Sequence, residues 1–241
     1  LAQALLESGG RDEALECFRR VGDVESDTRL FQIADIDPAE TAARQPGIHR
    51  LRNVTIDTGY WAVIDGDRIY CRETGNLNMA NSPLIRGRIT ADRRYAVMSV
   101  PAIAMRVDTP CVFLGGDDNY AHWFYRYLTR LALLDDLPEL GALPLLIGGD
   151  LKPYQRETLA LLGYGEDRVV SVPRHTAIHC SDIHVPLCLW TDNEPITRGI
   201  HWLRNQILAT FDSPATPHGR RLFISRRDAP SRYLENEEAV M

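Results

Sequence analysis

The residues best suited to chemistry in this chain lie in the string GGDDNYAHW at 115–123. The string contains two adjacent carboxylates, Asp117 and Asp118, and an imidazole, His122. A carboxylate or a neutral imidazole can accept a proton from a hydroxyl group as that hydroxyl attacks an electrophile, which is general base catalysis. The string therefore predicts a site at which a hydroxyl nucleophile is activated.

The neighbouring residues predict how this string is held. The apolar residues 111–114 indicate a short buried strand, the two glycines a turn, and the residues 120–134 a helix. Asp118 or Asn119 then caps the helix, and His122 falls in its first turn, where the positive helix end disfavours imidazolium. In α/β sheets a turn between a strand and a helix is a usual place for a site.

Each of these side chains has more than one interpretation on position alone. His122 is either a base or a structural histidine bonded to a nearby backbone group. Asp117 and Asp118 orient the imidazole, serve as the base themselves, or cap the helix. His122, Arg126 and Arg130 follow at i, i+4 and i+8, so they form a cationic stripe that either contacts an anionic group or faces solvent.

The wider pattern predicts an α/β fold for the second half of the chain. From Val107 onward, short apolar runs alternate with helical periodicity. This alternation is typical of a parallel sheet covered by helices. The expected strands are 111–114, 143–147, 168–172 and about 183–187, and the expected helices are 120–134, 154–162 and 196–211.

The first half of the chain has a different organisation. Residues 1–21 predict two short helices around a Gly9-Gly10 turn, residues 22–50 a polar linker, and residues 53–71 antiparallel strands with a hairpin turn at 65–67. The string LLESGGRDEALECFRRV at 5–21 resembles the end of a tetratricopeptide repeat, with small Ala14 where the helices pack closely. The alternative is a plain amphipathic helical hairpin.

Two separated motifs resemble glycosyltransferase family 61. The first is GGDDNYAHW at 115–123, followed by Arg130-Leu131, and the second is RLFISRRDA at 221–229, followed by Arg232 and Asn236-Glu237. The resemblance covers about residues 50–241. It implies an inverting enzyme of the GT-B fold that moves a sugar from a nucleotide-sugar donor to a glycan or other hydroxyl acceptor, as in the synthesis of capsular or other surface polysaccharides.

The resemblance also implies domains and roles. Residues 51–218 correspond to a Rossmann-like, acceptor-side domain, and residues 219–241 to the beginning of the donor-binding domain. His122 is the expected base, with Asp117 and Asp118 as alternatives, and Asn119 and Arg130 are expected to contact substrate. Backbone N–H groups and guanidinium groups after the second motif's strand suit a diphosphate, although a surface basic turn is the alternative. The expected diphosphate and donor contacts are Ser225, Arg226, Arg227, Arg232, Asn236 and Glu237.

The composition limits the function classes. A net charge of −6 argues against a general nucleic-acid binder, and no apolar run reaches the length of a membrane span. Five irregularly spaced cysteines fit a reducing compartment. We therefore expect a cytoplasmic protein, associated with membranes only through partners. The resemblance to the family implies that no metal cofactor is needed. The chain begins and ends inside helical patterns, so we expect a fragment that is inactive alone.

Two other function classes stay open. Arg126 stands where the family usually has an acidic residue, and Thr129 replaces a proline. These departures motivate the alternative hypothesis of an interaction protein, which recruits partners through helical repeats and carries a catalytically dead α/β domain. A metal hydrolase would use the cluster His175, His179 and His184 with nearby Cys and Asp residues. On a regular strand, however, His184 points away from His179, which argues against a metal site.

Overall fold

The structure is a computed structural model. It describes residues 2–20, 29–34, 47–59, 61–70, 88–89, 94–99, 102–116, 118–135, 137–187, 190–191, 194–195 and 197–210. The chain divides into two compact units, Leu1–Thr210 and Phe211–Met241, and every described residue belongs to the first. Within these ranges, each helix is too short or too polar to span a bilayer.

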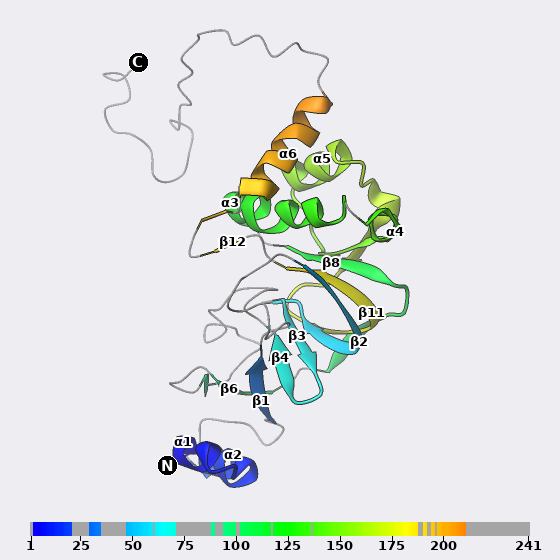
Figure 1. The fold of residues 1–241 in the computed structure, drawn as a ribbon. Helices are drawn as coiled ribbons and strands as arrows, with labels where there is room; N and C mark the ends of the chain where they lie inside the picture. The colour runs from blue at the N-terminus through cyan, green and yellow to red at the C-terminus, as the bar shows by residue number, and fades with distance from the viewer. Residues whose placement is uncertain are drawn as a thin grey trace, which may run out of the picture. The chain divides into compact units, whose positions relative to one another are not determined.

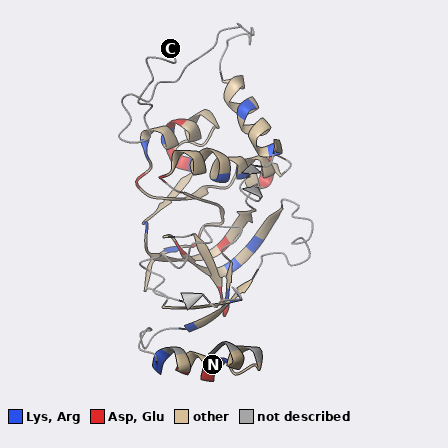
Figure 2. Ribbon diagram, turned by 90° about the vertical axis from the view of Figure 1, so that its left-hand side faces the viewer, with Lys and Arg blue, Asp and Glu red and all other residues tan. Residues whose placement is uncertain are grey.

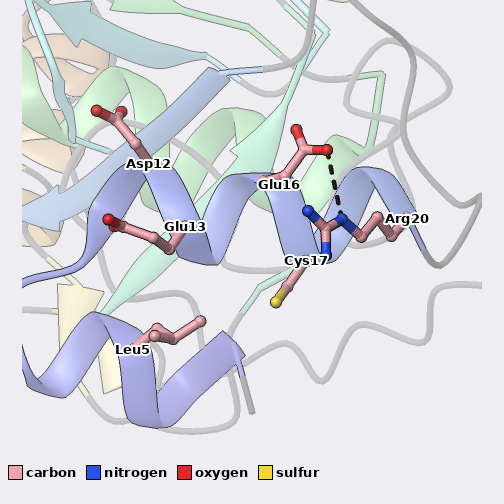
Figure 3. Close-up of a pocket in the computed structure, with 6 residues that line it drawn as sticks. All are labelled: Leu5, Asp12, Glu13, Glu16, Cys17 and Arg20. Atoms are coloured by element: carbon pink, nitrogen blue, oxygen red, sulfur yellow. Dashed lines mark ion pairs between the residues drawn. The ribbon is translucent and has the colours of Figure 1, made fainter.

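Two short helices lie at the start of the described residues. Helix α1 (Ala2–Glu7) and helix α2 (Arg11–Arg20) are joined at Gly9, whose φ of 86° suits a residue without a side chain. Ala14 is fully buried, as close helix packing requires. A hollow of about 410 Å³ lies against these helices. Figure 3 shows the residues that line it: Leu5, Asp12, Glu13, Glu16, Cys17 and Arg20. The resemblance to a tetratricopeptide repeat stays a prediction.

One part of the sheet is mostly antiparallel, with β1 and β4 as a parallel pair, and it is larger than the sequence predicts. Part of the expected linker 22–50 is strand β1 (Arg29–Ala34), which lies between strands β4 and β6. The predicted hairpin is present as β3 and β4, with Gly66 in its turn at a φ of 60°. The strands of this part are β1, β2 (Ile48–Asp57), β3 (Ala62–Asp65), β4 (Arg68–Tyr70), β5 (Arg88–Ile89) and β6 (Tyr95–Met98).

The parallel part of the sheet contains the predicted α/β strands. Its strands are β7 (Ile103–Val107), β8 (Cys111–Gly115), β9 (Leu145–Gly148), β10 (Val169–Val172) and β11 (Ala177–Pro186). They are ordered β10-β9-β8-β11, all parallel, with β7 also beside β11, and β2 continues the sheet antiparallel to β11. Strands β12 (Trp190–Thr191) and β13 (Glu194–Pro195) form a separate pair.

Among the described residues, helices cover one face of the parallel strands and antiparallel strands cover the other. Val112 and Leu114 of β8 pack in one core with residues of the helical segment 120–133 and of helices α5 (Pro153–Leu161) and α6 (Thr197–Ala209). Cys111 and Phe113 face the opposite way, into a core shared with β2, β3 and β4. Figure 1 shows α5, α6 and the helical segment 120–133 on one side of strands β8 and β11. The prediction of a helix-covered parallel sheet is therefore right for one face, because antiparallel strands cover the other.

The sheet coils so that the start of β11 returns to the far end of β10. Only residues 173–176 connect these two parallel strands, and the five steps from Val172 to Ala177 span at most about 18 Å. Three strand positions separate β10 from β11, which is already about 14 Å across a flat sheet. Because the two strands are parallel, the chain must also travel back along the strand direction from the end of β10 to the start of β11. So short a connection can do this only if the sheet coils. Coiling brings the end of β2 beside the loop 173–176, where the Thr58 hydroxyl donates to the Pro173 carbonyl (2.7 Å).

Two buried cysteines give a direct test of this core. Cys111 and Cys180 are fully buried on neighbouring strands, and burial raises the pKa of each thiol to about 12. Cys17 is only half-buried on α2. Because thiolates are the reactive form, we expect iodoacetamide to alkylate Cys17 in the folded protein and to spare Cys111 and Cys180 until denaturant is added. Peptide mass spectrometry measures this, and native alkylation of Cys111 as fast as that of Cys17 would show that the core is described wrongly.

Candidate functional site

The candidate site lies where three parallel strands end. The loops 116–119, 149–152 and 173–176 follow β8, β9 and β10, whose carboxyl ends point the same way. In open α/β sheets this edge is the usual position of a ligand site. Figure 2 shows basic and acidic residues on both helices and strands. The distribution of charge therefore does not locate the site. The individual contacts between its residues do.

Trp61 packs against the ends of β8 and β9, where two of these loops begin. It is 3% exposed, its indole N–H donates to the Gly116 carbonyl (2.6 Å), and its ring lies edge-on to Phe113 (5.5 Å between centroids). A Cβ on Gly148 would lie 2.9 Å from the Trp61 ring, which explains the glycine there. Trp61 has a φ of 58°, which is uncommon for a bulky residue and is found where the surrounding structure enforces it.

Glycine is required at the end of β8 for similar reasons. Gly115 has a φ of 86°, and a Cβ there would lie 3.0 Å from the Tyr127 ring. Both the backbone angle and the close ring exclude a side chain. The glycine turn predicted between the strand and the helix is therefore confirmed, and the Tyr127 ring and Trp61 hold it from two sides.

Asp118 is the point at which the three loops meet. Its Oδ1 accepts from Arg174 Nη1 (2.7 Å), and its Oδ2 lies 4.0 Å from Lys152 Nζ. Its backbone carbonyl accepts from the Tyr154 hydroxyl (3.1 Å). Arg174 Nε also donates to the Gly149 carbonyl (3.0 Å), so this guanidinium connects all three loops. The Asp118 carboxylate is thus engaged by a cation and orients the loop.

Asn119, and not Asp118, caps the helix. The Asn119 Oδ1 accepts from the backbone N–H of His122 (3.2 Å), and the Asn119 backbone has the extended conformation typical of an N-cap. Of the two capping residues that the sequence allows, the structure selects the second. His122 lies half-buried at the end of the first turn, as predicted. The cap holds the backbone of His122 beside the loop that Asp118 orients.

The helix that carries His122 is not a regular α-helix. It runs as α3 (Tyr120–His122), a π segment (Trp123–Tyr127) and a 3₁₀ segment (Leu128–Leu133). Changes of helix type alter which residues share a face. The predicted stripe of His122, Arg126 and Arg130 is therefore wrong, because Arg130 is only 1% exposed. Trp123 is fully buried beside His122, and its indole N–H donates to the Thr158 hydroxyl (2.9 Å).

Arg130, predicted to contact substrate, lies in the core. Its Nη1 donates to the Leu114 carbonyl (3.2 Å), and the guanidinium lies over the rings of Phe113 and Tyr127. These contacts hold the last residues of strand β8 in place. The other predicted site residues, Asp117, Ser225, Arg226, Arg227, Arg232, Asn236 and Glu237, lie outside the described residues.

The histidine cluster has a geometry that the sequence did not predict. The buried residues of β11 change from even to odd numbers along the strand: Ile178, Cys180, Ile183 and Val185. Asn53, opposite this change on β2, has a φ of 54°. His179 and His184 are therefore on the same face, and the prediction that they point apart is wrong. Among the described residues, no three His, Cys, Asp or Glu side chains converge as metal ligands.

Asp182, from the same cluster, forms an ion pair. Arg50 Nε and Nη2 donate to its two oxygens (2.9 and 2.5 Å), which connects β2 to β11. These hydrogen bonds hold the pKa of Asp182 below its usual range. Burial lowers the pKa of His184, and the Asp182 carboxylate opposes that shift. The contacts of this region are those of a structural strand pair.

The fold and the site define an α/β protein with polar groups assembled at the carboxyl edge of a parallel sheet. Comparison with known families gives a match to glycosyltransferase 61 over residues 120–241, just over half of the chain. The chain therefore belongs to glycosyltransferase family 61 and carries the domain of a transferase. The matched region includes His122 and the second motif. No curated protein and no solved structure matches the chain.

Three residues of the site were missed by the sequence analysis. They are Arg174, Trp61 and Lys152, none of which the sequence patterns marked as a site residue. One signal was available for two of them. Arg174 follows the predicted strand 168–172 and Lys152 follows the predicted strand 143–147, so both belong to the same sheet edge as 115–119. Trp61 had no such signal, because coiling of the sheet brings it there.

Proposed function

We propose that this protein is an inverting glycosyltransferase that moves a sugar from a nucleotide sugar to a hydroxyl group of a glycan or other acceptor, in the synthesis of surface polysaccharide. The observation that carries the proposal is the placement of His122. This histidine lies in the first turn of a helix at the carboxyl edge of the parallel strands, inside the region matched by the family. The nucleotide-sugar donor, the GT-B arrangement and the polysaccharide role are part of the proposal.

In the proposed step, His122 is the general base. The acceptor hydroxyl oxygen forms a bond to the anomeric carbon as His122 takes the hydroxyl proton. The bond between the anomeric carbon and the donor phosphate oxygen breaks, and its electron pair leaves with the nucleoside diphosphate. Attack opposite the leaving group inverts the anomeric centre. The contact between Asp118 and Arg174 favours His122 over Asp118 as the base, because one oxygen of that carboxylate already accepts from the guanidinium.

The donor side of the proposal rests on the second motif. Ser225, Arg226 and Arg227 are proposed to bind the diphosphate, and Arg232, Asn236 and Glu237 to contact the donor nearby. Guanidinium groups bind phosphate oxygens in forked pairs, and they supply the charge that a departing diphosphate requires without a metal. Asp117 is proposed to orient the base. A cytoplasmic location is also proposed, and the free thiols of Cys17, Cys111 and Cys180 support it.

Release of nucleoside diphosphate tests this proposal. The full-length protein is incubated with a panel of nucleotide sugars, with and without oligosaccharide acceptors, and the released nucleotide and the product mass are measured. We expect release with at least one donor, stimulated by an acceptor that gains one sugar. If no donor is consumed and no nucleoside diphosphate raises the melting temperature, the proposal fails, and an interaction protein with an inactive α/β domain becomes the better account.

A further inference from the structure

We propose that Arg174 is a positioning residue, which acts through Asp118 to hold His122 in place for proton transfer. The inference rests on the proposed function for its kinetic consequence, and on geometry alone for its structural one. Arg174 lies in the loop after β10, whereas His122 lies in the helix after β8. The two residues are far apart in the sequence, and any link between them is made by the fold. No feature of the family resemblance involves residue 174.

The first step of the argument is the way that Arg174 itself is fixed. Its side chain is 20% exposed and lies across Gly148, where a Cβ would come within 3.2 Å of its Nε. The same Nε donates to the Gly149 carbonyl (3.0 Å), and the Gly149 N–H donates to the Val172 carbonyl (2.6 Å). The guanidinium is therefore supported by the backbone of two strands. A glycine at 148 leaves the space that this side chain occupies.

The second step is the contact between Arg174 and Asp118. The 2.7 Å contact joins a guanidinium nitrogen to a carboxylate oxygen, and a charge-assisted hydrogen bond of this kind is stronger than a neutral one. Lys152 approaches the other oxygen only to 4.0 Å, and Tyr154 binds the backbone carbonyl. Arg174 is thus the closest charged contact of Asp118 among the described residues.

The third step leads from Asp118 to the base. Asp118 directly precedes Asn119, whose side chain caps the backbone N–H of His122. If the carboxylate of Asp118 loses this partner, only the Tyr154 hydroxyl and the more distant Lys152 still hold Asp118, so the cap at Asn119 shifts more readily. A displacement of about 1 Å at a reacting group can lower turnover by about a hundredfold. Loss of Arg174 should therefore act on turnover more than on substrate binding.

Kinetics of Arg174→Ala in the full-length protein give the first test. We expect kcat to fall about 10- to 100-fold, with KM changed by less than about threefold, because the geometry of the base is altered and not the binding of substrate. The matched control is Arg156→Ala, which removes an arginine from another exposed ion pair, with Glu166 (3.1 Å), on helix α5. This control should keep wild-type turnover.

A double-variant comparison separates positioning from general stability. Arg174→Ala and Asp118→Ala are measured singly and together. If Arg174 acts through Asp118, the double variant has nearly the kcat of the Asp118→Ala variant, because that variant already lacks the carboxylate that Arg174 binds. If the two losses multiply, Arg174 acts by another route and the proposal is overturned.

Hydrogen exchange gives a result that does not depend on activity. Arg174→Ala should speed exchange of the backbone amides at 119–123, including the capped amide of His122, and leave the amides of α6 unchanged. Unchanged exchange at 119–123 overturns the proposal. His122→Ala is assayed in parallel: if it retains wild-type turnover, the proposed base is wrong while the exchange result still decides the role of Arg174. A turnover loss in His122→Ala with none in Arg174→Ala overturns only the present inference.

Discussion

Replacing His122 with alanine in the full-length protein should lower kcat for sugar transfer about 10²- to 10⁴-fold, which is the usual contribution of a positioned general base. The reason is that, among the described residues of the loop after β8, His122 is the side chain best placed to accept a proton. Asp118 is engaged by Arg174 through its carboxylate, and Asn119 accepts the His122 N–H through its side-chain oxygen. KM should change little, because the proton is transferred only as the acceptor attacks. Steady-state rates of nucleotide release measure both constants.

Two further variants make this result specific. His122→Gln keeps a polar side chain that cannot take up the proton, so it should be as impaired as the alanine variant. His201→Ala removes an exposed histidine from α6 and should keep wild-type turnover. If His122→Ala remained within a few-fold of wild type, His122 would be a structural histidine, and the base would have to be sought elsewhere.

The second large effect concerns stability. Trp61→Ala should lower the free energy of unfolding by about 3–5 kcal/mol, the range for removing a large buried aromatic side chain. Trp61 is 3% exposed, packs on Phe113 and supplies the donor for the buried Gly116 carbonyl. Alanine leaves a cavity below the loops 116–119 and 149–152 and keeps the unfavourable positive φ of residue 61. Urea denaturation followed by circular dichroism gives this value.

A surface variant provides the comparison. Leu161→Ala truncates a side chain that is 40% exposed on α5, and it should change stability by about 0.5 kcal/mol or less. Trp61→Phe keeps most of the ring and loses the indole N–H, so it should lie between the two. Equal stabilities of Trp61→Ala and Leu161→Ala would contradict the burial of Trp61.

Local sequence patterns predicted the parallel strands and the elements between them. Each of β8, β9 and β10 begins within two residues of its predicted start, because a short apolar run bounded by glycine, proline or charge specifies a buried strand directly. The cap at Asn119 and the turn at Gly115 were likewise predicted from residue type. These features depend on interactions between residues that are close in the sequence, so a local sequence pattern is enough to predict them.

Features that depend on distant contacts were not predicted. Strand β1 lies in a polar stretch, and its pairing with β4 and β6 is set by strands 30 or more residues away. The regular period of residues 120–134 predicted one α-helix and an exposed Arg130, whereas packing of Trp123 and Tyr127 under the sheet edge accompanies a π segment that changes the exposed face. The same limit applies to Trp61, which comes from the antiparallel strands and reaches the site only because the sheet coils.

The anomeric configuration of the product is the most direct test of the proposed transfer. The full-length protein is given a nucleotide sugar with an α-linked donor and an acceptor glycan, and the new linkage is read by proton NMR. A base that activates the acceptor hydroxyl for a single displacement requires attack from the face opposite the leaving diphosphate. The account therefore predicts a β-linked product. An α-linked product would contradict it, because retention of configuration requires a different mechanism from the one assigned to His122.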